Sequence, residues 1–347
     1  MINILSRISA SSASTGGSLK VFRNLTRGLE RIGLPYVVNR SLDSCERIWV
    51  HDDVRAVPYL PPDARVVLGP NIYTFDLPTP QLPERMIFVY PSEWPRRHMQ
   101  MLGYGAEPSA IWPVGVDVDE FPPRPIASQS KVLLYYKNRP PEALREVEAL
   151  LHELGIEYRL LRYGSYREDE LRAALAGSRY AVWLAGSESQ GLAMLETLAS
   201  GVPVVVYDCT SLAMNWMVEL RVDAEVARLP VTSAPYFDDR CGMKATSMED
   251  LRAALLRMND AWTTYRPRDF VVEQLSLEKQ ARALVGLWDR IPPAADAPMG
   301  RPAIAPAEPL RLPPTWVVRA VLRQLRRRRF IRSAGELSQM AREATLS

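Results

Sequence analysis

The sequence contains few residues of the types that cross-link small folds or bind transition metals. Among its 347 residues are three cysteines and three histidines. Cys45, Cys209 and Cys241 form no CxxC pair, and their odd number gives no disulfide framework. The histidines show no spacing typical of metal ligands. We therefore expect reduced thiols, as in a cytoplasmic protein, and no metal cofactor.

Long hydrophobic runs are also absent. No stretch reaches the roughly 20 apolar residues that a membrane-spanning helix needs. The first residues, MINILSRISASSAS, have no long apolar core of the kind that a signal peptide contains. Both absences predict a cytoplasmic location.

The net charge is small and unevenly distributed. Residues 311–332 hold eight arginines and no acidic residue, and removing these eight charges from the formal net charge of +3 leaves the rest at −5. A slightly acidic body excludes a general nucleic-acid binder.

The length and composition favour two folded domains followed by a tail. Hydrophobic residues make up 47% and charged residues 24% of the chain, which is enough for large cores. Short apolar runs bounded by Pro, Asp and Gly predict strands, and Leu19–Ile32 has the spacing of an amphipathic helix. The strands expected in the first half are residues 1–5, Tyr36–Val38, Arg47–Val50, Arg65–Leu68 and Met86–Val89.

A second alternating unit follows a proline-rich hinge at residues 113–130. Its expected strands are Val132–Tyr136, Tyr158–Leu161, Tyr180–Leu184 and Val204–Tyr207, and its expected helices are Pro141–Leu154, Glu168–Ala176, Leu192–Ser200, Ser247–Met258 and Ser276–Trp288. The alternation predicts an α/β protein with two doubly wound, Rossmann-like domains. We expect the domains to span residues 1–125 and 126–290, followed by a Pro/Ala-rich linker, 291–314, and a basic tail, 315–347.

The segment 185–206, AGSESQGLAMLETLASGVPVVV, carries the strongest functional signal. Glu188 lies in the loop after a buried strand, and Gly191 begins a helix whose first N–H groups could bind a diphosphate. Glu196 follows one and a half turns later, and its carboxylate could accept hydrogen bonds from two ribose hydroxyls. The alternative is a strand–loop–helix unit with two solvated glutamates.

The whole pattern resembles the E-x7-E region of the retaining glycosyltransferases of family four, also called group 1. Three further segments resemble that family in the same order: the Gly-Gly pair before the first helix, the PSEW segment at residues 91–94, and PVGVDVDEF at residues 113–121. The positions that match the E-x7-E form are Glu188, Gly191, Leu192, Leu195, Glu196, Ala199, Gly201, Pro203, Val204 and Val205. The resemblance covers roughly residues 1–290.

The resemblance implies a GT-B fold, with the two domains facing a central cleft, and a nucleotide-sugar donor without a metal or other cofactor. It implies that Gly16 and Gly17 approach the donor phosphates or the acceptor, and that Glu188 contacts the donor sugar. Backbone N–H groups of Gln190, Gly191 and Leu192 would face the sugar and phosphate, and Glu196 would hold the ribose. The acceptor would lie on the first domain.

The resemblance also implies cations facing the diphosphate after the first strand of the second domain. Lys137 and Arg139 are the candidates, and the alternative is a solvated pair before a helix. The family histidine that touches the donor sugar is missing after Leu68. Asn71 is one candidate to replace it, and His51 at the end of the preceding strand is the other. A structural role for that histidine is the alternative.

Two remaining features have weaker signals. Asp117-Val118-Asp119 is a literal D-x-D, the metal motif of another glycosyltransferase class, but it lies in the proline-rich hinge and predicts no metal. Residues 315–332 could form a basic amphipathic helix at an anionic membrane surface, at the inner face of the membrane, or stay a disordered basic tail.

The predicted function is that of a metal-independent, retaining hexosyltransferase acting on a glycan, lipid-linked or small-molecule hydroxyl, in surface polysaccharide or glycoconjugate synthesis. Three alternatives stay open: a GT-B-like sugar-nucleotide epimerase, a phosphorylase, and a catalytically inactive adaptor with this fold.

Overall fold

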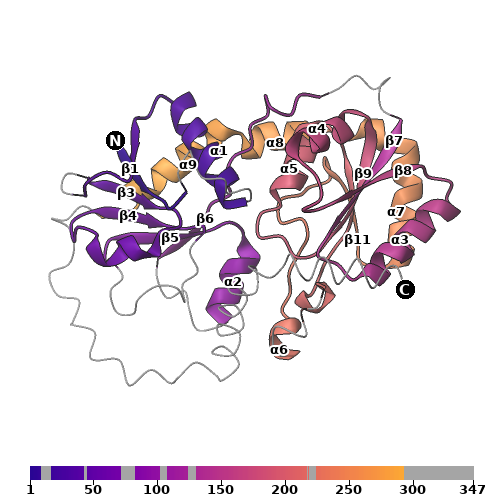
Figure 1. The fold of residues 1–347 in the computed structure, drawn as a ribbon, viewed down its shortest axis with the longest axis horizontal. Coiled ribbons are helices and arrows are strands. Elements are labelled where there is room, and N and C mark those ends of the chain that lie inside the picture. The colour runs from indigo at the N-terminus through magenta and orange to yellow at the C-terminus, as the bar shows by residue number, and fades with distance from the viewer. Residues whose placement is uncertain are drawn as a thin grey trace.

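The computed structural model describes residues 1–8, 17–42, 45–71, 83–101, 108–123, 130–216, 218 and 224–292. Figure 1 shows two lobes, each built around one sheet. Gly16, residues 124–129 of the expected hinge, most of the Pro/Ala-rich linker and the whole basic tail lie outside the described residues. None of the helices within the described ranges has the length and apolar character needed to cross a membrane.

The first lobe contains a six-stranded parallel sheet in the order β2-β1-β3-β4-β5-β6. Its strands and helices are β1 (Ile2–Leu5), α1 (Gly17–Arg31), β2 (Tyr36–Val38), β3 (Arg47–Val50), the 3-10 helix Val54–Tyr59, β4 (Arg65–Leu68), β5 (Met86–Tyr90), α2 (Glu93–Met101) and β6 (Ser109–Ile111). Alternate residues of β3 enter two different clusters, because Trp49 points to one face of the sheet and Ile48 to the other.

The second lobe contains a five-stranded parallel sheet in the order β11-β10-β9-β7-β8. Its elements are β7 (Lys131–Lys137), α3 (Pro141–Glu153), β8 (Tyr158–Arg162), α4 (Glu168–Ala176), β9 (Ser178–Ala185), α5 (Leu192–Ala199), β10 (Val204–Tyr207), the 3-10 helix Leu212–Met214, α6 (Ala224–Ala227), β11 (Gly242–Ala245), α7 (Met248–Ala261), the 3-10 helix Trp262–Thr264 and α8 (Pro267–Leu275). The last described helix, α9 (Leu277–Asp289), follows α8. The prediction of two parallel sheets flanked by helices is confirmed.

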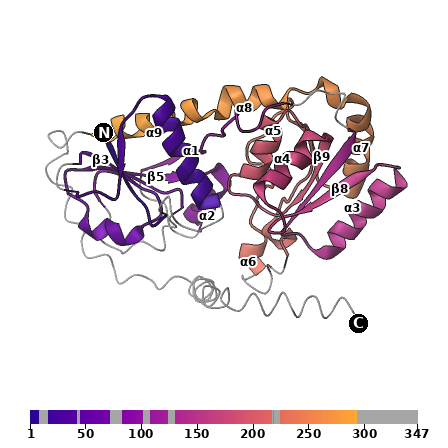
Figure 2. The ribbon, with the colours of Figure 1, turned by 45° about the horizontal axis from the view of Figure 1, so that its top comes forward.

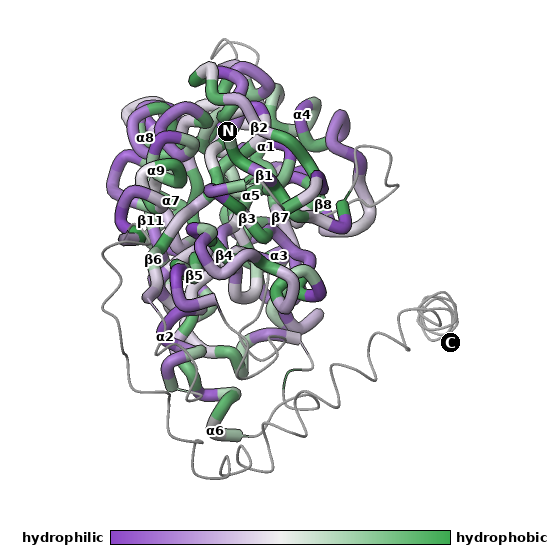
Figure 3. Tube along the Cα trace, turned by 90° about the vertical axis from the view of Figure 1, so that its left-hand side faces the viewer, coloured by the Kyte–Doolittle hydropathy of each residue, from purple (hydrophilic) through white to green (hydrophobic). Residues whose placement is uncertain are grey.

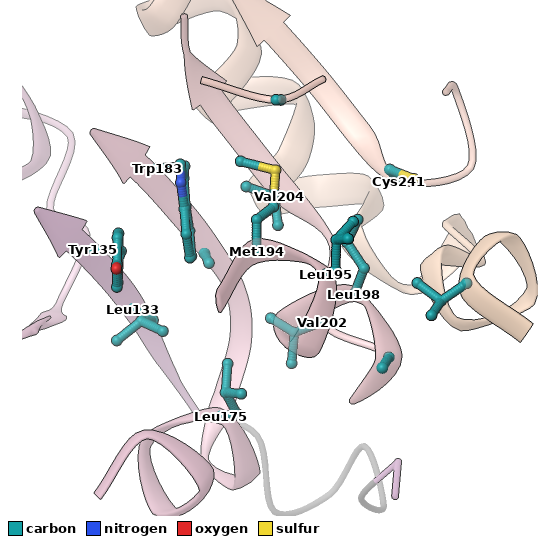
Figure 4. Close-up of a cluster of buried hydrophobic side chains, with 14 of the residues drawn as sticks. Leu133, Tyr135, Leu175, Trp183, Met194, Leu195, Leu198, Val202, Val204 and Cys241 are labelled. Atoms are coloured by element: carbon teal, nitrogen blue, oxygen red, sulfur yellow. The ribbon is translucent and has the colours of Figure 1, made fainter. Parts of the chain in front are cut away.

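Hydrophobic side chains between the second sheet and α5 form one of the large cores (Figure 4). The rings of Tyr135 and Trp183, on neighbouring strands, stack with centroids 3.9 Å apart and an interplanar angle of 8°. Met194 and Leu198 on α5 belong to the same cluster, which packs α5 against this face of the sheet. Along many helices the hydrophobic and hydrophilic stretches alternate, as Figure 3 shows, which fits helices with one buried face.

Helix α9 packs on the first sheet, although its residues fall in the expected second domain, 126–290. Figure 2 shows α8 and α9 (orange) running from the second lobe back to the first. Trp288 is fully buried there, and its Nε1 donates to the carbonyls of Arg65 and Ile48 at 3.0 and 3.3 Å. The apolar face of α9 joins the cluster beneath α1, so the chain connects the two lobes twice.

Arg268 on α8 links the two segments that connect the lobes, which are the expected hinge and the helices α8 and α9. Its guanidinium donates to the carbonyls of Val118 and Phe121, in the expected hinge, and to that of Ala199 at the end of α5. Nearby, a Cβ at Gly115 would lie 2.6 Å from the Leu277 Cα, so only glycine allows the first connection to pass this close to α9.

Candidate active site

The carboxyl ends of the two adjacent strands β7 and β9 bring Lys137 and Glu188 together. Lys137 is the last residue of β7, and Glu188 lies in the loop that follows β9. The Lys137 Nζ is 2.7 Å from the Glu188 Oε1, and both side chains are mostly buried. Burial lowers the pKa of Lys137, but the neighbouring Glu188 carboxylate more than offsets this, so the pKa is raised and the ammonium stays charged.

The Tyr163 ring lies beside this pair, with its centroid 4.4 Å from the Lys137 Nζ. Tyr163 itself is 53% exposed. The ammonium is therefore held between a carboxylate and an aromatic face, which fixes the position of a cation at the edge of the sheet.

Glu196 lies in the second turn of α5 and is 4% exposed. Its two carboxylate oxygens accept hydrogen bonds from the Nζ of Lys20, at 2.7 and 2.9 Å. Burial raises the pKa of Glu196 to about 6, against the opposing effect of the Lys20 charge. Because Lys20 belongs to α1, this ion pair joins the first lobe to the second.

Lys20 is a site residue that the sequence reasoning missed. The sequence signal was the scarcity of lysine, since only five of the 43 basic residues are lysine. In the structure two of the five, Lys20 and Lys137, pair with the two glutamates of the E-x7-E pattern. An ammonium is a compact point charge that rotates freely, whereas the guanidinium used elsewhere in this chain is a rigid planar fork. Lys20 also contacts Glu168 on α4, at 3.1 Å.

The start of α5 is left without a capping side chain. Gly191 is the N-cap residue, and its φ of +77° is a left-handed conformation that favours glycine. Since glycine has no side-chain oxygen, the N–H groups of the first turn, including that of Leu192, have no N-cap acceptor. This leaves a positive helix end between Glu188 and Glu196.

The Gln190 side chain points away from this helix end. Its Oε1 accepts from the Val114 N–H at 3.2 Å, and its Nε2 donates to the Val114 carbonyl at 2.9 Å. Only the backbone of Gln190 is therefore available for the donor contact expected from the sequence.

Arg139 lies near Lys137 in sequence but has different contacts. It is 2% exposed, and its Nη1 donates to the carbonyls of Ala185 and Tyr207, at 3.3 and 3.2 Å. Burial lowers the pKa of Arg139. The described contacts of its guanidinium thus hold the ends of β9 and β10 together and do not include Glu188.

Asn71 and His51, the two candidates to replace the family's sugar-contacting histidine, contact one another. The Asn71 Nδ2 lies 2.6 Å from the His51 Nε2, and the His51 Nδ1 lies 3.2 Å from the Ser6 Oγ. The Asn71 amide nitrogen is a donor, so the His51 Nε2 is its acceptor in this contact. The His51 ring is fully buried, so Asn71 is the more accessible of the two.

Gly17 and the D-x-D motif lie near opposite ends of α1. Gly17 is the first residue of α1, and among the described residues no atom lies within 4 Å of the position that a Cβ would take there. At the other end of the helix, Arg31 pairs with Asp117 at 2.7 Å and with Asp119 at 2.9 Å. The D-x-D carboxylates are thus ion-paired with arginine. In the ranges that the structure describes, no cluster of three or more His, Cys, Asp or Glu side chains could hold a metal ion.

Comparisons with known proteins identify the fold. No family model and no curated protein sequence matches the chain. Solved structures do match: the catalytic domain of starch synthase IV from Arabidopsis thaliana, bound to ADP and acarbose, has a TM-score of 0.53 at 12% identity, over 83% of this chain and 98% of that one.

Two further structures agree with this result over 83% of the chain at 12% identity. The lipopolysaccharide outer core galactosyltransferase WaaB in its apo form has a TM-score of 0.52, covering 99% of that chain. Sucrose-phosphate synthase from Thermosynechococcus elongatus has a TM-score of 0.51, covering 98% of that chain. The protein has the GT-B fold, as the sequence predicted.

Proposed function

We propose that the protein is a glycosyltransferase that moves a sugar from a nucleotide-diphosphate donor to an acceptor hydroxyl. The observation that carries the proposal is the constellation at one sheet edge. It comprises the Lys137–Glu188 pair, the uncapped start of α5 and the buried carboxylate of Glu196.

Each part of a nucleotide sugar has a matching group in this constellation. The ribose hydroxyls donate to Glu196, which requires Lys20 to move from the carboxylate. The diphosphate faces the N–H groups of Gly191 and Leu192 and the ammonium of Lys137. The sugar lies beside Glu188, whose carboxylate accepts from its hydroxyls. Gly17 begins α1 on the first lobe, where we place the acceptor, and the expected role of Gly16 concerns a position outside the described residues.

The chemistry breaks the bond between the anomeric carbon and the phosphate oxygen and forms one to the acceptor oxygen. The acceptor hydroxyl loses its proton to the departing phosphate, and negative charge grows on the nucleoside diphosphate. Lys137 stabilises that charge from a fixed position, without a metal ion. Attack from the same face as the leaving group gives retention, in keeping with the family that the E-x7-E pattern resembles. Asn71 is the proposed first-lobe contact of the sugar, with His51 holding its amide.

The setting of the reaction is a further part of the proposal. We place it in polysaccharide or glycoconjugate synthesis, because the similar structures include enzymes named for starch and lipopolysaccharide synthesis. A glycan or lipid-linked acceptor and a cytoplasmic location follow from that setting. The basic segment 315–332 would then contact an anionic membrane surface.

The test is a thermal-shift screen of UDP-, GDP-, dTDP- and ADP-sugars, followed by product analysis with the stabilising donor. A glycoside with the donor's anomeric configuration supports the proposal. An epimerised sugar nucleotide, or a reaction that depends on inorganic phosphate, would replace it with an epimerase or a phosphorylase. The absence of any stabilising sugar nucleotide would instead support a catalytically inactive adaptor with this fold.

A further inference from the structure

The loop 186–191, which carries Glu188, is held by side chains of the first lobe. The Trp94 Nε1 donates to the Glu188 carbonyl at 2.8 Å. The Ser92 Oγ donates to the next carbonyl, that of Ser189. Both donors come from the beginning of α2 and the residue before it, nearly 100 positions away in sequence. Two consecutive carbonyls of the loop are therefore turned toward the first lobe.

A third contact holds the far end of the same loop. The Gln190 side chain makes two hydrogen bonds with the backbone of Val114, which lies in the connection between the two sheets. Gln190 is 6% exposed and Val114 is fully buried, so these bonds are shielded from water. Shielded bonds of this kind are costly to break, since neither partner can turn to solvent.

The second lobe holds the rest of the loop. The Glu188 N–H donates to the Thr232 carbonyl at 3.0 Å, and its side chain pairs with Lys137. The Ser187 N–H donates to the Asn215 Oδ1 at 2.8 Å. The backbone of Glu188 is therefore fixed on its N–H side by the second lobe and on its carbonyl side by the first. The direction of its carboxylate depends on both.

The Trp94 ring is held in place by a second aromatic ring on the same helix. Its ring meets the His98 ring one turn further along α2 in an edge-on arrangement, with centroids 4.9 Å apart. His98 is buried, and burial lowers its pKa, so a neutral ring faces the indole. A single N–H on a fixed ring thus sets the position of the Glu188 carbonyl.

We propose that Trp94 is a positioning residue that aims the Glu188 carboxylate at the donor sugar only when the two lobes are together. Ser92 and the Gln190–Val114 contact assist it. This inference rests on the proposed function and adds to it the residue that links lobe contact to the geometry of the site. A displacement of the loop would misplace Glu188 relative to the reacting sugar, and small misplacements of a positioned group reduce rates strongly.

The test is Trp94→Phe, which keeps the aromatic ring and removes the N–H. We expect turnover of the donor found in the screen to fall by about 10- to 100-fold. Affinity for the corresponding nucleoside diphosphate, drawn from UDP, GDP, dTDP and ADP, should change less than about twofold, because that ligand lacks the sugar. Trp262→Phe is the matched control, since Trp262 packs on the opposite face of the second sheet, and its turnover should equal that of the wild type.

A second measurement needs no ligand. Hydrogen exchange of the amides at 187–190 should be at least about tenfold faster in Trp94→Phe, and also in Gln190→Met, than in the wild type and Trp262→Phe. Unchanged turnover together with unchanged exchange in Trp94→Phe would overturn the inference. So would equal losses of turnover and nucleotide affinity, which indicate general structural damage. If the wild type binds no nucleotide, the proposed function fails, while the exchange rates still decide whether Trp94 holds the loop.

Discussion

Lys20 and Glu196 are 176 positions apart and form an ion pair in which one ammonium contacts both carboxylate oxygens, at 2.7 and 2.9 Å. The pair joins α1 of the first lobe to α5 of the second and occupies the oxygens that a ribose would need. Glu196 is therefore a buried carboxylate whose two oxygens both contact the ammonium of the first lobe. Four expectations follow from this arrangement and its surroundings.

The pH dependence of nucleotide binding should report the state of Glu196. In the proposed complex its carboxylate accepts hydrogen bonds from the ribose, so with a pKa of about 6 for this group the nucleoside diphosphate affinity should fall as the pH drops through that value. Lys20→Met should move this midpoint to higher pH, because the Lys20 charge lowers the pKa of Glu196. Titration calorimetry between pH 5 and 8 measures both midpoints. Lys279→Met, on α9, serves as the control, and identical midpoints in wild type and Lys20→Met would refute the coupling.

The difference in unfolding free energy between Glu196→Gln and the wild type should change with pH. Burial raises the pKa of Glu196 from the usual 4.5 to about 6, so the contribution of this group to stability is fully present below pH 4.5 and is lost as the pH rises through 6. Glutamine does not titrate, so the variant should gain about 2 kcal/mol relative to the wild type between pH 4.5 and 7.5, on top of the constant cost of leaving Lys20 without this partner. Urea unfolding at both pH values measures the change. The same difference at both pH values would contradict the raised pKa.

Lys137→Met should lower turnover by about 100-fold, because the leaving diphosphate loses a fixed cation. The matched control is Lys131→Met at the other end of the same strand, where the side chain is exposed and far from the carboxyl edge. Steady-state kinetics with the donor found in the screen separate the two. Similar turnover in Lys137→Met and the control would remove Lys137 from the mechanism.

Arg268→Met should destabilise the fold without a direct effect on the ligand. Three carbonyls, of Val118, Phe121 and Ala199, lose their donor, and unpaired carbonyls of this kind cost about 1–3 kcal/mol each when water cannot reach them. We expect a loss of roughly 2–4 kcal/mol in unfolding free energy. Arg257→Met, at an exposed position on α7, should change it by less than about 0.5 kcal/mol.

The sequence was most informative where structure depends on neighbouring residues. The buried strand before Glu188, the glycine that begins α5 and the glycine that ends it are all within one short segment, and local patterning determines each of them. The parallel sheets followed for the same reason, since strands buried on both faces are continuous hydrophobic runs. Strands β6 and β11 were not predicted, because runs of three or four residues of mixed polarity are too short to show a hydrophobic periodicity.

Contacts between distant segments were not predictable in the same way. Nothing local to Lys20 indicates Glu196, and nothing local to Arg139 shows that its guanidinium holds backbone carbonyls. Helix α9 has an ordinary amphipathic pattern, and only the buried Trp288 against the first sheet reveals which lobe it covers. An apolar face indicates that a helix is buried, but not against which partner.

The most direct test of the central claim is the affinity of the protein for a nucleoside diphosphate, compared between the wild type and Glu196→Ala by titration calorimetry at pH 7.5. The account places the ribose on Glu196, and losing hydrogen bonds to a charged acceptor should weaken binding by at least about tenfold. Affinity equal to that of the wild type would contradict the assignment of this helix start as the donor site.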